Sequence, residues 1–169
     1  MKKLFYLAAI FSFALMNLNA QDGMKLGVNA ALPIGDAGDF FSFGAAADLA
    51  FVWGVSDNFG AGVVTGFGHY FGKDAEFGDD DFSVEVEGVD YSFIPVAGTA
   101  RFNLSEQFTL GADLGYAIAV SDGAEGGFYY APRVQYGVSE TMDIVLSYRG
   151  ISFDGGSLDA IALGLQFGL

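Results

Sequence analysis

The single histidine, His69, is the one side chain of this sequence whose unperturbed chemistry suits general-base catalysis near neutral pH. An acyl-transfer enzyme would need this imidazole beside a serine, or beside an acid that orients it. Tyr70 and Phe71 follow His69 instead, and its neighbours on the same face of the expected strand are apolar. The sequence therefore predicts a structural or interfacial histidine, no catalytic residue and no enzyme.

The most polar stretch, residues 72–90, contains eight acidic residues and one lysine. Asp79, Asp80 and Asp81 supply oxygen atoms of the kind that Ca²⁺ prefers, but the spacing and final glutamate of an EF-hand are absent. We therefore expect a solvated loop, with no metal and no cofactor. Because residues 83–89 alternate, the loop is expected to extend as a hairpin and to offer the contact surface for an extracellular or envelope protein partner.

Five charged residues lie within apolar alternating segments, on the opposite parity from the large apolar side chains. They are Asp48, Arg101, Asp113, Arg133 and Arg149. If a hairpin pairs Val120 with Gly126, Asp113 lies opposite Arg133, and Arg101 lies about one diagonal step away. Because buried charges are costly without partners, we predict an Arg-Asp-Arg row, completed by the other two residues into a polar network in a barrel interior.

The alternation itself has a period of two and predicts strands. Eight segments of 10 to 13 residues are close to the length, roughly 9 to 12 residues, that a tilted membrane-spanning strand needs. They are residues 24–33, 43–54, 59–71, 91–103, 108–120, 128–138, 142–153 and 158–169. An even number lets the first strand pair with the last, so the predicted fold is an all-β, eight-stranded antiparallel up-and-down transmembrane β-barrel.

The connections fall into two classes. Residues 55–59, 104–108 and 138–142 share an apolar-Ser-acid-polar-apolar pattern, which predicts tight turns on the periplasmic side. Longer extracellular loops are expected at residues 34–42, 72–90, 121–127 and 154–157. Pro95 and Pro132 suggest bulges or later strand starts, and Gly150 suggests a further bulge.

The two faces of the strands differ in kind. In the second strand, Phe43, Leu49 and Trp53 would face lipid, whereas glycines 60, 62, 66 and 68 would make room inside for the arginines. Aromatic residues cluster towards strand ends, as two interfacial girdles would require. The expected girdle residues are Trp53, Phe59, Phe102, Phe108, Tyr136 and Phe167 on one side, and Phe43, Phe67, Phe71, Tyr91, Tyr130 and Phe153 on the other.

Residues 1–20 have the pattern of a secretory signal peptide, with Lys2 and Lys3 before an apolar run and Ala20 at the expected cleavage site. The remaining 21–169 then form one outer-membrane barrel domain of a Gram-negative cell. With 21 acidic residues against 7 basic ones, nucleic acid is not an expected partner. The absence of cysteine excludes a lipoprotein anchor and disulfides.

The last strand resembles the C-terminal signal read by the barrel assembly machinery, through Gly164, Phe167 and the final Leu169, although that signal usually ends in Phe or Trp. The whole mature pattern is similar to the small outer-membrane β-barrel family that includes PorT-type proteins and the transmembrane domain of outer-membrane protein A. Phe93-Ile94-Pro95-Val96 followed by Arg101-Phe102 resembles a segment common in the PorT-type group. The resemblance implies an integral outer-membrane location, with membrane lipid and the assembly machinery as partners.

Three functions fit this sequence. The first is a structural or interaction barrel with a side-chain-filled interior, and the second is a narrow channel or porin for small solutes, although eight strands leave little open space. The third is a soluble lipocalin-like binding barrel, which would need an apolar interior where this sequence places arginines.

Overall fold

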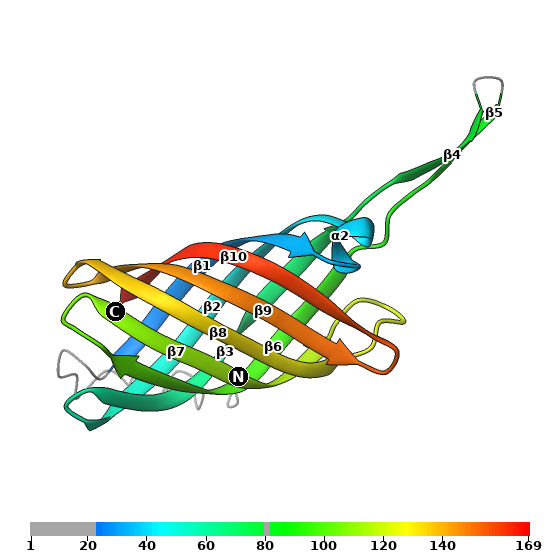
Figure 1. Ribbon diagram of the computed structural model, residues 1–169. Coiled ribbons are helices and arrows are strands. Elements are labelled where there is room, and N and C mark those ends of the chain that lie inside the picture. The colour runs from blue at the N-terminus through cyan, green and yellow to red at the C-terminus, as the bar shows by residue number, and fades with distance from the viewer. Residues whose placement is uncertain (1–22, 80–81) are drawn as a thin grey trace, which may run out of the picture.

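The computed structural model describes residues 23–79 and 82–169, so the expected signal peptide lies outside the described part of the chain. Eight antiparallel strands close into a barrel in the order β1-β10-β9-β8-β7-β6-β3-β2, which confirms the predicted fold (Figure 1). Their bounds are β1 Gly23–Ile34, β2 Phe41–Ser56, β3 Phe59–Gly72, β6 Tyr91–Asn103, β7 Phe108–Ala119, β8 Gly127–Ser139, β9 Met142–Phe153 and β10 Gly156–Gly168. Over these described residues, no helix has the length and apolar character needed to cross a membrane.

The three short turns, between β2 and β3, β6 and β7, and β8 and β9, lie at one end of the barrel (Figure 1). The opposite end contains the short helix α2 (Ala37–Phe40) and a hairpin of β4 (Ala75–Asp79) and β5 (Phe82–Val86) that projects beyond the barrel (Figure 1). These two strands pair only with each other, as a separate sheet. The side chains of residues 75–86 lie outside the described part of the structure. The expectation that Asp79, Asp80 and Asp81 bind no Ca²⁺ therefore stays a prediction.

The connection between β9 and β10 differs from the expected longer loop. Phe153 pairs directly with Gly156, so only Asp154 and Gly155 form the turn. Gly155 has a φ of 95°, a left-handed conformation that glycine adopts without steric cost. The hairpin therefore closes with a two-residue turn, and the sequence prediction of a longer loop here was wrong.

The barrel closes where β1 pairs with β10, from Lys25 opposite Gly168 to Ile34 opposite Asp159. The backbone N–H of Leu169 also donates to the carbonyl of Met24 at 2.9 Å, so the hydrogen bonding between the two ends of the barrel sheet extends to Leu169. Closure leaves neither β1 nor β10 with an unpaired edge. This matters in a bilayer because an unpaired backbone group there costs several kcal/mol.

Side-chain alternation separates an apolar exterior from a mixed interior. On β10, Leu163 is 58 % exposed, whereas Ala160 and Ala162 are fully buried. Most of the expected girdle aromatics also point outward, Trp53 and Phe43 among them. Tyr91 and Phe153 are exceptions, because Tyr91 is a buried core residue and Phe153 packs against the core. Both stand on the inward parity of their strands, so their assignment to a girdle was wrong.

The prolines do not displace the strands. Pro95 pairs with Ala117 and Pro132 with Ala112, and the β3–β6 and β8–β9 ladders lose pairs near them without any change of register. The predicted bulges and later strand starts are therefore wrong at both positions. A proline removes one ladder donor but leaves the extended backbone intact, which explains the local gap.

Gly150 also keeps its register, in pairs with Asp159 and Tyr130. A side chain at this position would overlap the Tyr130 ring, which lies over the glycine on the outer face. The interruption of the apolar pattern at Gly150 thus makes room for an aromatic ring and is not a bulge.

Interior glycines of β2 and β3 make room mainly for aromatic rings, whereas the sequence analysis expected room for arginines. A Cβ atom on Gly68 would overlap the Phe93 ring, and one on Gly44 would lie 2.5 Å from Tyr70. Arg101 lies instead against Gly111 on β7, where an added Cβ would be 2.8 Å from the guanidinium Nη1. The sequence analysis predicted that the β3 glycines make room for the arginines. That prediction was wrong, because the atoms nearest to these glycines belong to other residues.

Candidate functional site

The carboxylate of Asp113 is fully buried and lies at the centre of a charged cluster in the barrel. Arg101 Nη1 donates to its Oδ1 at 2.9 Å, and Arg133 Nη2 donates to its Oδ2. Thr99, directly opposite on β6, donates its hydroxyl to Oδ1. One buried negative charge therefore lies between two buried guanidinium groups, an arrangement that satisfies the carboxylate on both oxygens.

The register that produces this cluster is shifted from the predicted one. Asp113 pairs with Ala131, and Arg133 pairs with Gly111, so the two charged residues are diagonal neighbours and not directly opposite. The shift is two residues, which keeps both side chains on the inner face. The long arginine side chain spans the diagonal step, as does that of Arg101 on the other side.

Asp48 and Arg149 form a second buried pair. Arg149 Nη2 and Nη1 both donate to the Asp48 carboxylate, the latter at 3.4 Å. Asn29 Nδ2 adds a third donor to Asp48 at 2.9 Å. The structure thus places all five predicted charged residues inside the barrel, in two groups and not in one continuous row.

Aromatic rings fill the interior on the loop side of these charges. Tyr70 and Phe93 stack at 6.0 Å between centroids, and Tyr91 and Tyr129 lie at 5.8 and 6.3 Å from Phe93. Tyr70, Phe93 and Tyr129 are each 3 % exposed or less. Together, the ion pairs and the rings form a packed set of buried side chains in the barrel interior.

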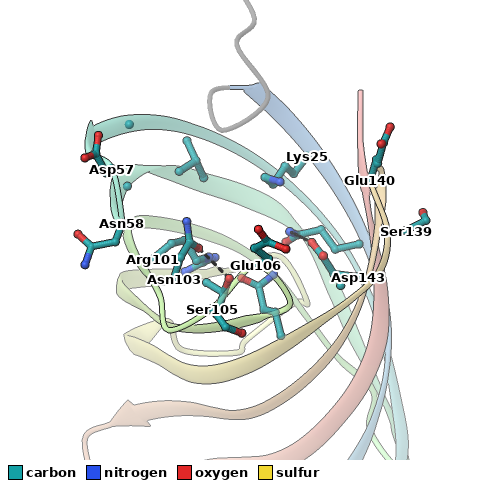
Figure 2. Close-up of a pocket in the computed structure, with 17 residues that line it drawn as sticks. Lys25, Asp57, Asn58, Arg101, Asn103, Ser105, Glu106, Ser139, Glu140 and Asp143 are labelled. Carbon is teal, nitrogen blue, oxygen red and sulfur yellow. Dashed lines mark hydrogen bonds between the residues drawn. The ribbon is translucent and has the colours of Figure 1, made fainter.

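A cavity of about 450 Å³ opens at the end of the barrel where the short turns lie. Figure 2 shows Lys25, Arg101 and Asp143 around it, from β1, β6 and β9. Gln135 and Gln166 lie deep in the wall, at 4 and 5 % exposure, and Glu106 and Glu140 lie on the exposed turns. We call this space the turn-side cavity. Arg101, which is paired with Asp113, is part of its lining.

His69 has polar partners that the sequence analysis did not identify. Its Nδ1 lies 2.7 Å from Ser92 Oγ, and its Nε2 lies 3.4 Å from Asp90 Oδ2. Ser92 is the cross-strand partner of His69 on β6, and Asp90 precedes that strand. The alternation along the strand predicts that Ser92 faces outward. The pairing of Ser92 with His69 could not be predicted, because the long loop of residues 72–90 does not fix the register of the two strands.

The predicted assembly residues lie on the closing strand and just beyond it. Phe167 and Leu169 have the outward parity of β10, and Leu169 is 58 % exposed. Gly164 faces inward opposite Asn29, and a side chain there would overlap the Asn29 amide. Gly164 therefore has a steric reason to be glycine, independent of any recognition by an assembly machinery.

A closed eight-stranded sheet with an apolar outer surface and a packed, charged interior defines a small transmembrane β-barrel. The model of the outer membrane protein beta-barrel domain family matches residues 5–169. The chain belongs to this family, and it is an integral protein of the outer membrane.

Solved structures share the fold at low sequence identity. A de novo designed transmembrane β-barrel is 12 % identical, with a TM-score of 0.56 over 91 % of this chain and 100 % of that one. The attachment invasion locus protein Ail of Yersinia pestis is 16 % identical, with a TM-score of 0.53 over 88 % and 97 %. The N-terminal β-barrel domain of Pseudomonas aeruginosa OprF is 11 % identical, with a TM-score of 0.50 over 88 % and 100 %. Among curated proteins, none matches the chain.

Proposed function

We propose that this protein is a non-conducting outer-membrane barrel with a structural or interaction role, whose interior is a core and whose extracellular segments meet a partner. The observation that carries the proposal is the packed set of buried side chains in the barrel interior, made of the two ion-paired groups and the aromatic rings. The burial of Tyr129 at 2 % exposure and of Asp113 at 0 % supports a lumen that is filled by side chains. An eight-stranded barrel has an interior of just the size that side chains fill.

The base of the projecting hairpin supports a role for residues 72–90 as the contact surface. The backbone N–H of Gly72 donates to Asp90 Oδ1 at 2.8 Å, and that of Gly88 donates to Asp74 Oδ1 at 2.8 Å. Lys73 N–H donates to the Phe40 carbonyl of α2 at 2.8 Å. These bonds fix both ends of the segment to the rim, so the hairpin is presented from an ordered base.

The charge of this segment indicates what kind of partner it meets. Ail has been solved with the heparin analogue sucrose octasulfate, a polyanion. Residues 72–90 here contain eight acids and one lysine, which would repel such a ligand. The partner we propose is an extracellular or envelope protein with a basic surface, and the barrel assembly machinery is a partner only during biogenesis.

We further propose that the protein has no enzymatic activity. Ser92, His69 and Asp90 do form a hydroxyl-imidazole-carboxylate chain, but Asp90 is also held by Gly72 N–H, and its side chain is 54 % exposed. A well-solvated carboxylate stabilises a charged imidazole weakly. The three residues are better explained as a polar link between the rims of β3 and β6.

Planar bilayer recording of the purified protein tests the proposal. We expect no stable open level, because charged and aromatic side chains fill the lumen. Reproducible conductance steps, abolished by a larger residue at Ala131, would instead support the narrow-channel alternative. The soluble lipocalin-like alternative is not supported, since the family is an outer-membrane one and the apolar face is outside.

A further inference from the structure

A carboxylate lies on the outer, lipid-facing side of the barrel, near the end that contains the longer loops. It belongs to Asp159 of β10, which has the same parity as the exposed Ile161 and Leu163. Asp159 is half-buried, and both of its carboxylate oxygens accept hydrogen bonds from neutral hydroxyl groups. Tyr130 donates to Oδ1 at 2.9 Å, and Ser157 donates to Oδ2 at 2.6 Å. These donors hold the carboxylate in place but carry no charge to balance its own.

Among residues 23–79 and 82–169, no basic side chain forms an ion pair with Asp159. The three arginines pair with carboxylates inside the barrel, and His69 pairs with Asp90. Lys25 lies in the turn-side cavity, and Lys73 Nζ donates to a backbone carbonyl of α2. A negative charge on the lipid-facing surface of a barrel is unfavourable unless it reaches water or a cation. We therefore expect a cationic group from outside the protein beside Asp159.

The aromatic rings next to Asp159 indicate which kind of cation fits. Tyr130 and Tyr148 stack at 6.1 Å between centroids, and Phe128 extends the row at 6.1 Å from Tyr130. An ammonium group is attracted by the faces of such rings as well as by a carboxylate. Ca²⁺ or Mg²⁺ would instead need about six oxygen ligands. The described residues contain no cluster of acids and histidines that could hold a metal ion, so an ammonium group fits this position better.

An open groove of about 530 Å³ begins beside the same rings, on the outer face of the barrel. From the end nearest Asp159 towards the short turns, its outward-facing lining includes Tyr148, Ile161, Pro132, Val134 and Leu146. Tyr148 belongs both to the ring row and to the groove, so the two features are continuous. An acyl chain in the groove would bury apolar surface and would place the head group of the same lipid near Asp159.

We propose that this face of β8, β9 and β10 binds one aminophospholipid molecule. Its primary ammonium group donates to Asp159 and lies against the rings of Tyr130 and Tyr148, and one acyl chain occupies the groove. A carboxylate has about four acceptor positions, so the hydroxyl donors leave room for the ammonium group. The proposal depends on the outer-membrane location and is independent of the protein partner proposed for residues 72–90.

Native mass spectrometry of the full barrel, released from detergent micelles, counts the lipids that it retains. The probes are phosphatidylethanolamine, phosphatidylcholine and phosphatidylglycerol with identical acyl chains. Phosphatidylethanolamine should bind about 5-fold more tightly than phosphatidylcholine, whose quaternary ammonium group cannot donate a hydrogen bond. Phosphatidylglycerol should bind more weakly still, because its head group brings only negative charge next to Asp159. Equal binding of the three lipids would overturn the proposal, as would phosphatidylglycerol binding that requires Ca²⁺ or Mg²⁺.

Two variants, each with a matched control, separate the head group from the acyl chain. Asp159→Asn keeps the side-chain size but removes the charge, and should bring the two ammonium lipids to within about 2-fold of each other. Asp154→Asn, in the adjacent exposed turn, should keep the preference. Leu146→Trp fills the groove and should weaken both lipids by about 5-fold. Val63→Trp, on the outer face of β3 across the barrel, should leave both unchanged.

Heat-modifiable gel mobility checks that each variant is a folded barrel before lipid is added. If Asp159→Asn does not fold, the comparison of the three lipids still decides the question, because it uses the unchanged protein. Loss of the preference in Asp154→Asn as well would show a general charge effect and overturn the assignment to Asp159. A complex of two chains that disappears in Leu146→Trp would show that a second copy covers the groove, and would also overturn the proposal.

Discussion

Asp48 on β2 and Arg149 on β9 form an ion pair inside the barrel, although 101 residues separate them in the sequence. The strands β1 and β10 lie between β2 and β9 in the sheet order, and their pairing is the seam that closes the barrel. The ion pair therefore connects the two sides of the seam across the interior. It links the N-terminal and C-terminal halves of the fold directly, although β2 and β9 are not adjacent strands and share no backbone hydrogen bonds.

The first prediction concerns this pair. Arg149→Met leaves Asp48 as a buried carboxylate with only Asn29 as a donor, and should lower the free energy of unfolding by about 3–5 kcal/mol. The double variant Arg149→Met and Asp48→Leu should recover much of that loss, because no uncompensated charge remains. Urea unfolding in lipid vesicles, followed by the fluorescence of the single Trp53, measures both. If Arg149→Met unfolds at the same urea concentration as the unchanged protein, the pair does not stabilise the barrel.

The second prediction ranks changes in the Asp113 cluster. Asp113→Ala leaves two guanidinium groups buried without their shared carboxylate, whereas Arg133→Leu leaves Asp113 with Arg101 and Thr99 as donors. Both variants should lower the unfolding temperature in detergent, and Asp113→Ala should lower it more. Glu140→Gln on an exposed turn serves as the control, with an expected change of less than about 0.5 kcal/mol. The reverse order of the two interior variants would contradict the assignment of Asp113 as the shared acceptor.

A third prediction tests the aromatic packing. Gly68→Ala places a methyl group against the Phe93 ring, and such overpacking typically costs about 1–3 kcal/mol. Gly98→Ala is the matched control, since its nearest contacts are at 3.9 and 4.0 Å and the added methyl group has space. Denaturant midpoints for the two variants should therefore differ clearly. Equal midpoints would mean that the ring of Phe93 moves away at no cost.

The fourth prediction addresses enzymatic activity. A fluorophosphonate probe, which reacts with activated serines, should not label Ser92 in the folded protein, because the proposed role of His69 is to bond the rims together. Mass spectrometry of the tryptic peptides reads this directly, and Ser42, an exposed serine of β2, provides the background level. Labelling of Ser92 above Ser42, lost in His69→Ala, would show that the polar chain activates a nucleophile and would disprove the non-enzymatic proposal.

The last prediction concerns assembly. If Phe167 belongs to the recognised C-terminal signal, Phe167→Ala should slow insertion by a reconstituted barrel assembly machinery while leaving spontaneous folding into detergent nearly unchanged. Leu163→Ala removes a comparable outward side chain from the same strand and is the control. A Leu169→Phe variant, which restores the usual terminal residue, should insert at least as fast as the unchanged protein. Equal slowing by Phe167→Ala and Leu163→Ala would indicate a general loss of apolar surface.

Much of this fold was determined by local sequence. The period-two alternation gave the eight strands to within two residues at their ends and assigned the inward side of Asp48, Arg101 and Asp113. This works because each strand of a membrane barrel has lipid on one side and a crowded interior on the other, so that parity alone assigns a side chain to a face. The outer-membrane location is shown by the family match.

Tertiary structure decided which of these side chains meet. The two-residue shift that pairs Asp113 with Ala131, and the pairing of His69 with Ser92, both lie across loops whose length leaves the register open. The contact between Asp48 and Arg149 is even harder to predict from the sequence, because β2 and β9 are not neighbouring strands. It depends on the closure, tilt and diameter of the whole barrel, and these are properties of all eight strands together that no single segment specifies.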